Sequence, residues 1–244
     1  TGARAFAPPV KGLEPEDAFL MRTVEDALRF KDRLKKNDIK HAVVIGASMA
    51  GIKVVEVLHK YGIETWLLDL ASYIFPLAAY KEVAKEIEKR VEAQGVHLMF
   101  GVTIDHMEQE NGEKTAVLTD GSRIPADIVG LCIGTRAITD TVQGEVEIGR
   151  GIVVDDHMRT SVPGIYAAGD CCEGNNLESG QNQIIGLWAN ANHQGETAGI
   201  NMAGGDMAYK GNILHNITHF MNMDFIGFGD NRMQGEVLEY GSLS

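Results

Sequence analysis

The chain has 244 residues and 44% hydrophobic content, enough for one large domain or two ordinary ones. Acidic residues outnumber basic residues by 34 to 22, and the resulting net charge of −12 repels polyanions, so we expect no nucleic-acid partner. No uninterrupted apolar run is long enough to cross a bilayer, so we expect no membrane partner either.

The cysteines and the first residues indicate a cellular context. Cys132, Cys171 and Cys172 are too few for a disulfide framework, so we expect a reducing, cytoplasmic location. The opening "TGARAFAPPVKG" has neither an initiator Met nor the pattern of a signal peptide, which favours a piece of a longer protein.

The next part of the chain has the pattern of a β-α-β unit. Residues 24–36 combine helical spacing of apolar residues with a basic end, which predicts a helix. The run "AVVIG" at 42–46 predicts a buried strand, residues 49–61 a helix, and "TWLLD" at 65–69 a second strand.

Residues 77–94 predict an amphipathic helix, with these residues on its core side: Ala78, Val83, Ile87 and Val91. A third strand, "VHLMFG", follows at 96–101. Hairpin turns at Asn111-Gly112 and Asp120-Gly121 then predict a β-meander that returns to a strand at 128–133. The pattern predicts an α/β fold, a Rossmann-like parallel sheet with a meander.

The chain changes character after Gly134. Residues 151–170 predict two short strands joined at Pro163-Gly164, and residues 173–186 predict a loop. A helix is expected from about Leu187 to Met202, and strands resume after Ile213.

The stretch "GASMAG" has the spacing of a dinucleotide-binding turn. Gly46 and Gly51 supply the first and third glycines, and Ser48 stands at the second, where a Cβ crowds the pyrophosphate. Asp69 ends the next strand and can accept hydrogen bonds from ribose hydroxyls; no Arg follows in "DLASYIF", which favours NADH over NADPH. The alternative is an ordinary tight turn and an acid that merely ends a strand.

Four stretches resemble one protein family. These are "TGARA" at the start, "RTVEDALRFKDRL", "CIGTRA" and "TSVPGIYAAGDCC", and with the glycine turn they follow the order of the FAD-dependent pyridine nucleotide-disulfide oxidoreductases. The resemblance covers nearly the whole chain. It is strongest to the branch of NADH oxidases, rubredoxin reductases, coenzyme A disulfide reductases and the nitrite reductase flavin domain.

This resemblance implies four segments. Residues 1–24 would end a first FAD-domain segment, 25–150 would form the NADH-binding domain, 151–209 would return to the FAD domain, and 210–244 would begin an interface domain. The last segment implies a homodimer. The glycine fingerprint of the first FAD segment and the N-terminal redox Cys of disulfide reductases are both missing from the sequence.

The resemblance also implies ligands. Gly134 joins the glycine turn and Asp69 around NADH, and FAD would be contacted by Thr1, Gly2, Gly169 and Asp170. Two positions depart from the family. Met49 stands where an aromatic residue commonly gates the nicotinamide pocket, and Lys53 stands where Glu is usual.

Several reactive residues have simpler interpretations. We expect Cys171 and Cys172 to be small side chains packed near the flavin. His215 and His219 lie in a predicted strand with Asp224 as the sole third ligand, so we expect no metal. His193 can shuttle a proton, pack or face solvent, and Trp188 can cover the flavin or fill a core.

The sequence thus predicts the NADH-binding portion of a flavoprotein oxidoreductase. In the complete enzyme, hydride would pass from NADH to FAD and electrons onward to an unidentified acceptor. The alternative is a non-catalytic nucleotide-binding or interaction module without bound flavin.

Overall fold

The computed structural model describes residues 2–142, 144–231, 236, 238, 240 and 241. The chain divides into two compact units, which are described separately. One contains Ala5–Gly134 and Asn216–Gly227, and the other is built mainly from Thr135–His215. Within the described ranges, no helix combines the length and apolar character needed to span a bilayer.

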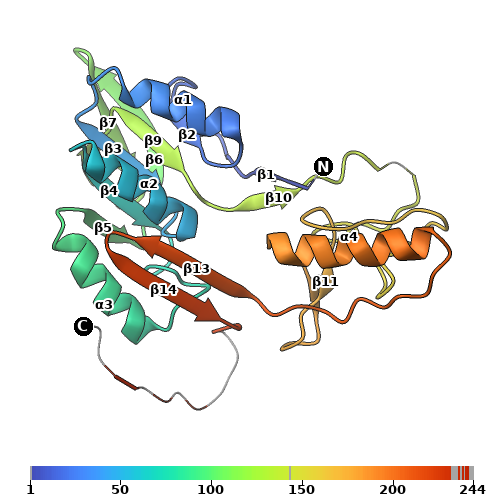
Figure 1. Cartoon of the computed structure of the whole chain (residues 1–244). Helices are drawn as coiled ribbons and strands as arrows, with labels where there is room; N and C mark the ends of the chain where they lie inside the picture. The colour runs from blue at the N-terminus through green and yellow to red at the C-terminus, as the bar shows by residue number, and fades with distance from the viewer. Residues whose placement is uncertain (1, 143, 232–235, 237, 239, 242–244) are drawn as a thin grey trace. The chain divides into compact units, whose positions relative to one another are not determined.

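A five-stranded parallel sheet forms the centre of the first unit (Figure 1). Its strand order is β2 (Ala18–Leu20), β9 (Ile128–Leu131), β3 (His41–Ile45), β4 (Glu64–Asp69) and β5 (His97–Phe100). All four neighbouring pairs are parallel. The predicted Rossmann-like α/β fold is confirmed.

Alternate side chains of the sheet enter two different cores, because successive residues of a strand point to opposite faces. Ala42 and Val44 pack with the helices α1 (Val24–Leu34), α2 (Met49–Lys60) and α3 (Lys81–Glu92). Val43 and Ile45 pack on the other face, against the meander. Burial on both faces explains why these strands are continuous apolar runs.

The meander consists of β6 (Ile104–Glu110), β7 (Glu113–Leu118) and β8 (Arg123–Pro125), paired antiparallel. Asn111 and Gly112 both have positive φ, as a two-residue hairpin turn requires, and Gly121 also has positive φ. The predicted meander and its turns are confirmed.

The predicted helix at 77–94 is wrong at its start, since α3 begins at Lys81. The amides of Ala78 and Ala79 both donate to the Phe75 carbonyl in a tight turn that precedes the helix. The expected core side is also partly wrong. Val83 is exposed and Ala84 is buried in its place.

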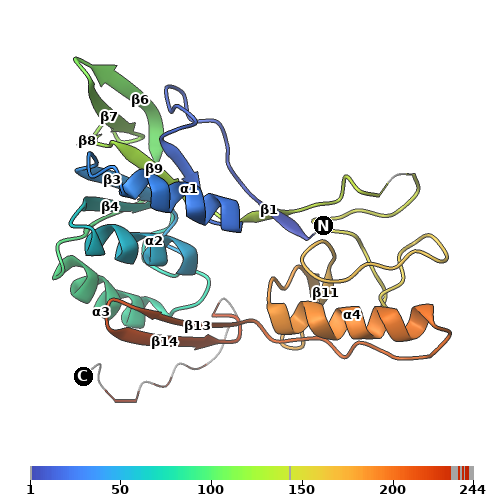
Figure 2. The same ribbon diagram turned by 45° about the horizontal axis from the view of Figure 1, so that its top comes forward.

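The strands predicted after Ile213 form a hairpin, β13 (His215–Phe220) and β14 (Met223–Phe228). Met221 and Asn222 at its turn both have positive φ. Figures 1 and 2 show the hairpin beside α3. Phe220 and Phe225 are buried in the same core as α2 and α3.

Glu56 on α2 anchors this hairpin. Its buried carboxylate accepts hydrogen bonds from Lys53 (2.5 Å), Lys60 (3.1 Å) and the Met221 N–H (3.2 Å). Burial alone raises the pKa of Glu56, but these three donors outweigh it and hold the pKa at about 2, below the ordinary value of 4.5.

We expect a pH-dependent loss of stability from this site. Because the pKa of Glu56 is lower in the folded chain than in the unfolded chain, its stabilisation is present above about pH 4.5 and is lost as the pH falls towards 2. Urea unfolding between pH 5 and 2 should show a steeper decline for the wild type than for Glu56→Gln. Glu82→Gln, at an exposed position of α3, should lose stability with falling pH as the wild type does. An equal decline of the free energy of unfolding in all three proteins would contradict the role of Glu56 as an anchor.

The second unit contains α4 (Trp188–Met202), the pair β1 (Ala3–Ala5) and β10 (Thr135–Ala137), and the pair β11 (Gly174–Asn175) and β12 (Asn182–Gln183). The helix expected from Leu187 is confirmed. The two strands predicted at 151–170 are wrong, because only single bridges form there, for example between Arg159 and Tyr166. The predicted loop at 173–186 contains β11 and β12.

Candidate functional site

The glycine turn lies where the order of the parallel sheet reverses. β3 is followed on one side by β4 and β5, and on the other by β9 and β2. Gly46 follows β3 and approaches the end of β9 so closely that a Cβ on it would lie 2.3 Å from the Cys132 carbonyl oxygen. Its φ of +105° also requires glycine. The carboxyl ends of the strands at such a reversal point are where open α/β sheets bind ligands.

Gly51 makes the close contact between helix and strand expected of the third glycine. A Cβ at this position would lie 1.9 Å from the carbonyl oxygen of Gly46. The first turn of α2 contains no acidic residue, so no side-chain carboxylate there neutralises the positive end of the helix. This helix start is therefore suited to an anion such as a pyrophosphate.

Ser48 caps α2. Its hydroxyl accepts a hydrogen bond from the Gly51 N–H (3.3 Å) and donates one to the Cys132 carbonyl (3.1 Å). The side chain therefore holds the turn to the end of β9, and its donor is already used within the protein. Met49, the first residue of the helix, is half-buried.

We expect Ser48→Gly to lower the Kd for NADH by about two- to five-fold, because removing the Cβ opens the approach to the pyrophosphate. The loss of the serine cap is a small effect, since glycine at this position costs a helix only a few tenths of a kcal/mol. Ser48→Ala is the matched control because it retains the Cβ and loses the cap. Calorimetric titration should show a gain for glycine alone, and an unchanged Kd for Ser48→Gly would refute this account of the turn.

Asp69 ends β4 beside the glycine turn. Its carboxylate accepts hydrogen bonds from the Ala47 N–H (2.7 Å) and the Ala71 N–H (2.8 Å). A carboxylate has about four acceptor positions, so these two bonds fix its orientation and leave capacity for ribose hydroxyls. The structure thus brings the predicted acid to the predicted turn.

Gly134 lies at the same edge of the sheet, three residues after β9. Its φ is +100°, a conformation that favours glycine. The neighbouring Ile133 amide lies 3.2 Å from where a Cβ of Gly46 would be, so the two glycine segments are adjacent.

The residues expected at FAD lie in the second unit, except Thr1, which is outside the described residues. Gly169 has a φ of +82°, and its N–H donates to the buried Gln194 side chain of α4 (2.8 Å). A Cβ on Gly186, just before that helix, would lie 4.0 Å from the Asp170 carboxylate. Gly169 and Asp170 therefore lie beside the start of α4. Gly2 has a φ of +85°, and its carbonyl accepts from the Ile138 N–H.

The three cysteines are free thiols. Burial raises the pKa of Cys132 to about 12. A hydrogen bond from Cys172 lowers the pKa of Cys171, with a further contribution from the Gly2 backbone, and the pKa of Cys172 is raised in return. Cys172 is buried as expected, whereas Cys171 is half-buried beside Gly2.

The other reactive residues have different surroundings. Trp188, the first residue of α4, is 85% exposed, so it fills no core, and His193 is exposed. His219 pairs with Asp224 through Nδ1 (2.8 Å) on the exposed side of the hairpin. A group of adjacent residues, Asp155, Asp156 and His157, brings three ligand atoms within 4.8 Å, but His157 is already bonded to Asp156.

Two residues near the turn have roles that the sequence does not reveal. Lys53 donates to Glu56 and to the His219 carbonyl (2.5 Å), so its ammonium binds the hairpin. Phe75 donates its N–H to the Ala47 carbonyl inside the glycine turn (2.9 Å). The Lys53–His219 and Phe75–Ala47 contacts could not be inferred from the sequence, because the two residues of each pair are distant along the chain.

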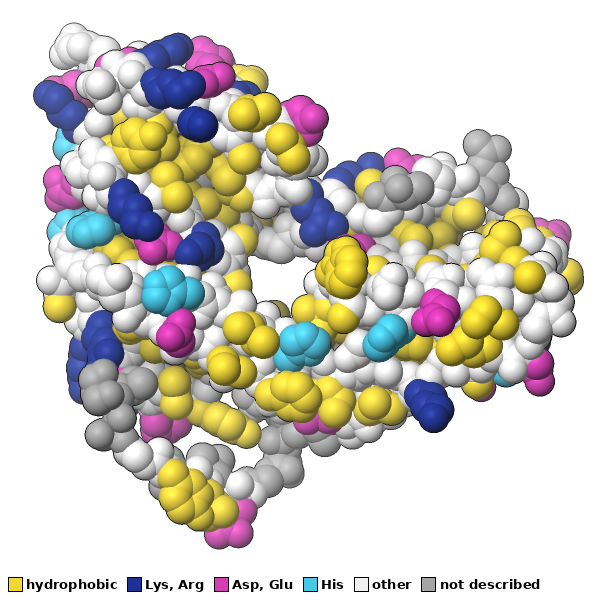
Figure 3. All heavy atoms as spheres, in the orientation of Figure 1, with side chains coloured by type: hydrophobic (Ala, Val, Ile, Leu, Met, Phe, Trp, Pro, Cys, Tyr) yellow, Lys and Arg dark blue, Asp and Glu magenta, His cyan; other side chains and the backbone are white. Residues whose placement is uncertain are grey.

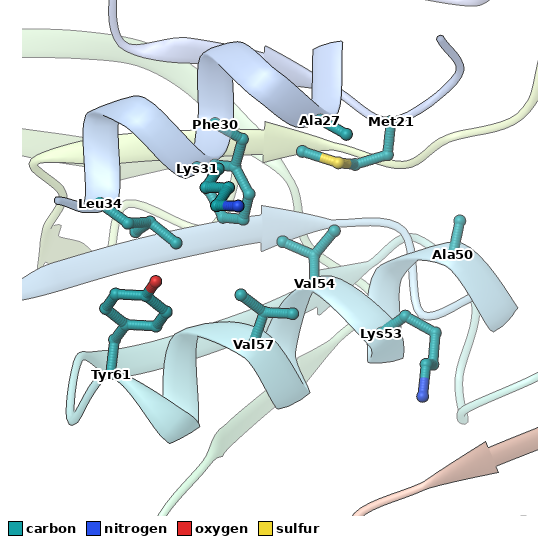
Figure 4. A pocket seen from close by; sticks show the side chains of 10 residues that line it. All are labelled: Met21, Ala27, Phe30, Lys31, Leu34, Ala50, Lys53, Val54, Val57 and Tyr61. Atoms are coloured by element: carbon teal, nitrogen blue, oxygen red, sulfur yellow. The ribbon is translucent and has the colours of Figure 1, made fainter. Parts of the chain in front are cut away.

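An apolar groove of about 530 Å³ lies between α1 and α2. Phe30 and Leu34 of α1 face Val54 and Val57 of α2 across it (Figure 4). Figure 3 shows its hydrophobic floor with basic side chains around it. The groove has no carboxylate in its lining for ribose hydroxyls, so the glycine turn remains the nucleotide-site candidate.

Comparisons with known proteins extend over most of the chain. A profile of the family described as "Pyridine nucleotide-disulphide oxidoreductase" matches residues 1–195. The NADH oxidase of Methanocaldococcus jannaschii is 29% identical over 206 residues, which cover 84% of this chain and 46% of that protein. The NADH-dependent phenylglyoxylate dehydrogenase subunit epsilon of Aromatoleum evansii is 28% identical over 243 residues, covering 98% and 57%.

A comparison with solved structures finds the same fold. The water-forming NADH oxidase from Lactobacillus brevis, determined with bound NADH, superimposes with a TM-score of 0.87 at 26% identity, covering 94% of this chain and 51% of that one. The chain thus spans about half the length of these relatives. On the match to the family profile, together with a glycine turn at the reversal point of a parallel sheet, the chain belongs to the pyridine nucleotide-disulphide oxidoreductase family.

Proposed function

We propose that this chain is the NADH-binding portion of a flavoprotein oxidoreductase. The observation that supports it most is the glycine turn between β3 and α2, with Asp69 bonded to the Ala47 N–H. The turn offers a helix start to the pyrophosphate, and the adjacent carboxylate accepts from ribose hydroxyls. Negative charge at Asp69 disfavours a 2′-phosphate, so the nucleotide is NADH rather than NADPH.

The fit of this site to a dinucleotide rests on its shape. Gly46 and Gly51 leave no room for a Cβ, and their absent side chains let the start of α2 and the ends of β3 and β9 come close together. The hydroxyl of Ser48 is bonded to Cys132, so the backbone of the turn makes the phosphate contacts.

FAD belongs to the second part of the proposal. Gly2, Gly169 and Asp170 would contact it, and the left-handed backbone of both glycines fits a close approach of the chain to a ligand. Bound FAD supplies an acceptor for the NADH hydride and a route for the electrons to a further acceptor. The protein's contribution is to orient the nicotinamide and exclude water.

The functional segments proposed for the complete enzyme are those expected from the sequence. Residues 1–24 and 151–209 contribute to the FAD domain, 25–150 bind NADH, and 210–244 begin the interface domain through which two copies pair. The relatives have different names, among them NADH oxidase and CoA-dependent NAD(P)H sulfur oxidoreductase. We propose no single acceptor.

The test is the visible absorption spectrum of the purified chain supplied with FAD, followed by NADH addition without oxygen. We expect a retained flavin band that NADH bleaches. Asp170→Ala should retain less flavin, while Asp206→Ala, an exposed acid of the same unit, should retain as much as the wild type.

Each of three other results would argue against a different part of the proposal. NADH binding without any retained flavin would favour the non-catalytic nucleotide-binding module for the isolated chain. A retained flavin that NADH does not bleach would contradict the hydride transfer. A chain that binds no NADH would contradict the proposal as a whole.

A further inference from the structure

Phe75 connects the hairpin β13–β14 to the glycine turn. Its ring lies edge-on to Phe220, with centroids 5.4 Å apart, and is tilted against Phe225 at 5.2 Å. Its N–H donates to the Ala47 carbonyl at 2.9 Å. One residue therefore contacts both the hairpin core and the turn.

Phe75 is held in an unfavourable backbone conformation. Its φ is +55°, in the left-handed region that bulky residues rarely adopt, and the side chain is only 1% exposed. A conformation of this kind persists where the surroundings impose it. Here the surroundings are the two hairpin phenylalanines and the Ala47 carbonyl, so the hairpin contributes to keeping Phe75 in place.

The hydrogen bond from Phe75 fixes one peptide plane of the glycine turn. In a planar trans peptide the C=O and the next N–H point in opposite directions. Holding the Ala47 carbonyl towards Phe75 therefore sets the direction of the Ser48 N–H. The other side of Ala47 is fixed by Asp69. Both peptide groups that flank Ala47 are thus oriented from outside the turn.

The hairpin is itself firmly docked at its turn. The Met221 N–H donates to Glu56, and its carbonyl accepts from the Gln94 side chain at 3.4 Å. Lys53 donates to the His219 carbonyl. Gly227 approaches Ala78 so closely that a Cβ would lie 2.6 Å from the Ala78 oxygen. These contacts reach α2, the segment just after α3 and the turn that carries Phe75.

We infer that the hairpin β13–β14, acting through Phe75, positions the Ala47–Ser48 peptide for nucleotide binding, so that NADH affinity depends on a segment about 170 residues away in sequence. The inference rests on the proposed NADH site and adds a positioning role for Phe75, Phe220 and Phe225. By linkage, NADH must stabilise hairpin docking by the same factor by which docking strengthens NADH binding.

The test compares two identical substitutions on one strand of the full chain. Phe225→Leu removes one of the two rings that contact Phe75, whereas Phe228→Leu changes a side chain that is 72% exposed. We expect the Kd for NADH to rise about five- to ten-fold in Phe225→Leu and to stay within about two-fold of wild type in Phe228→Leu.

Hydrogen exchange of the wild type supplies a readout that does not depend on any variant. NADH should slow exchange at the Phe75 amide and across residues 220–225. Two results would overturn this inference and leave the proposed function standing: a wild type that binds NADH without slower hydrogen exchange at these amides, or a folded Phe225→Leu variant with the wild-type Kd for NADH. A wild type that binds no NADH would overturn the proposed function and this inference together.

Discussion

Replacing Gly51 by alanine is expected to raise the Kd for NADH by about ten- to a hundred-fold, the effect of the 1–3 kcal/mol that overpacking typically costs. The added Cβ would lie 1.9 Å from the Gly46 carbonyl oxygen, so α2 and the turn must separate. Calorimetric titration with NADH measures the loss, and thermal unfolding should show a lower Tm.

Gly195→Ala is the control for this substitution. Gly195 lies within α4, and nothing stands within 4 Å of a Cβ placed there. The change should stabilise the helix by about 0.5–1 kcal/mol and leave the Kd for NADH unchanged. Wild-type affinity in Gly51→Ala would show that the nucleotide does not use this turn.

Asp69→Ala is expected to raise the Kd for NADH by about ten- to a hundred-fold, because hydrogen bonds to a charged group contribute about 1.5–3 kcal/mol. The substitution also leaves the Ala47 and Ala71 N–H groups without their present acceptor. The preference for NADH over NADPH should shrink, since the charge that repels a 2′-phosphate is gone. Parallel titrations with both nucleotides measure this.

Asp69→Asn separates charge from hydrogen bonding. It keeps an acceptor oxygen and removes the negative charge, so we expect a smaller loss of NADH affinity together with a similar loss of discrimination against NADPH. If both variants kept the wild-type preference, Asp69 could not be the residue that reads the ribose.

The sequence was sufficient to predict the elements whose signals are local. The buried strands around Val44 and Leu67 are continuous apolar runs, and the Asn111-Gly112 turn needs residues that tolerate positive φ. The turn at Gly46 and the acid at Asp69 could be placed together because a β-α-β unit fixes their spacing.

Features that depend on long-range contacts could not be predicted. α3 begins at Lys81 rather than at Leu77, because Phe75 and Ile74 are buried in a turn whose packing partners include the distant hairpin. Lys53 stands where the family resemblance leads one to expect Glu, and its ammonium binds the carbonyl of His219, which is 166 residues away. Periodicity within one segment contains no information about such partners.

The most direct test of the central claim is an NADH titration of the isotopically labelled chain followed by amide NMR shifts. We predict the largest shifts at Ala47, Ser48 and Met49, and at the residues that follow Asp69. Two results would contradict NADH binding at the glycine turn: amide signals of this turn that do not shift, or saturable binding that shifts only the signals of residues lining the groove between α1 and α2.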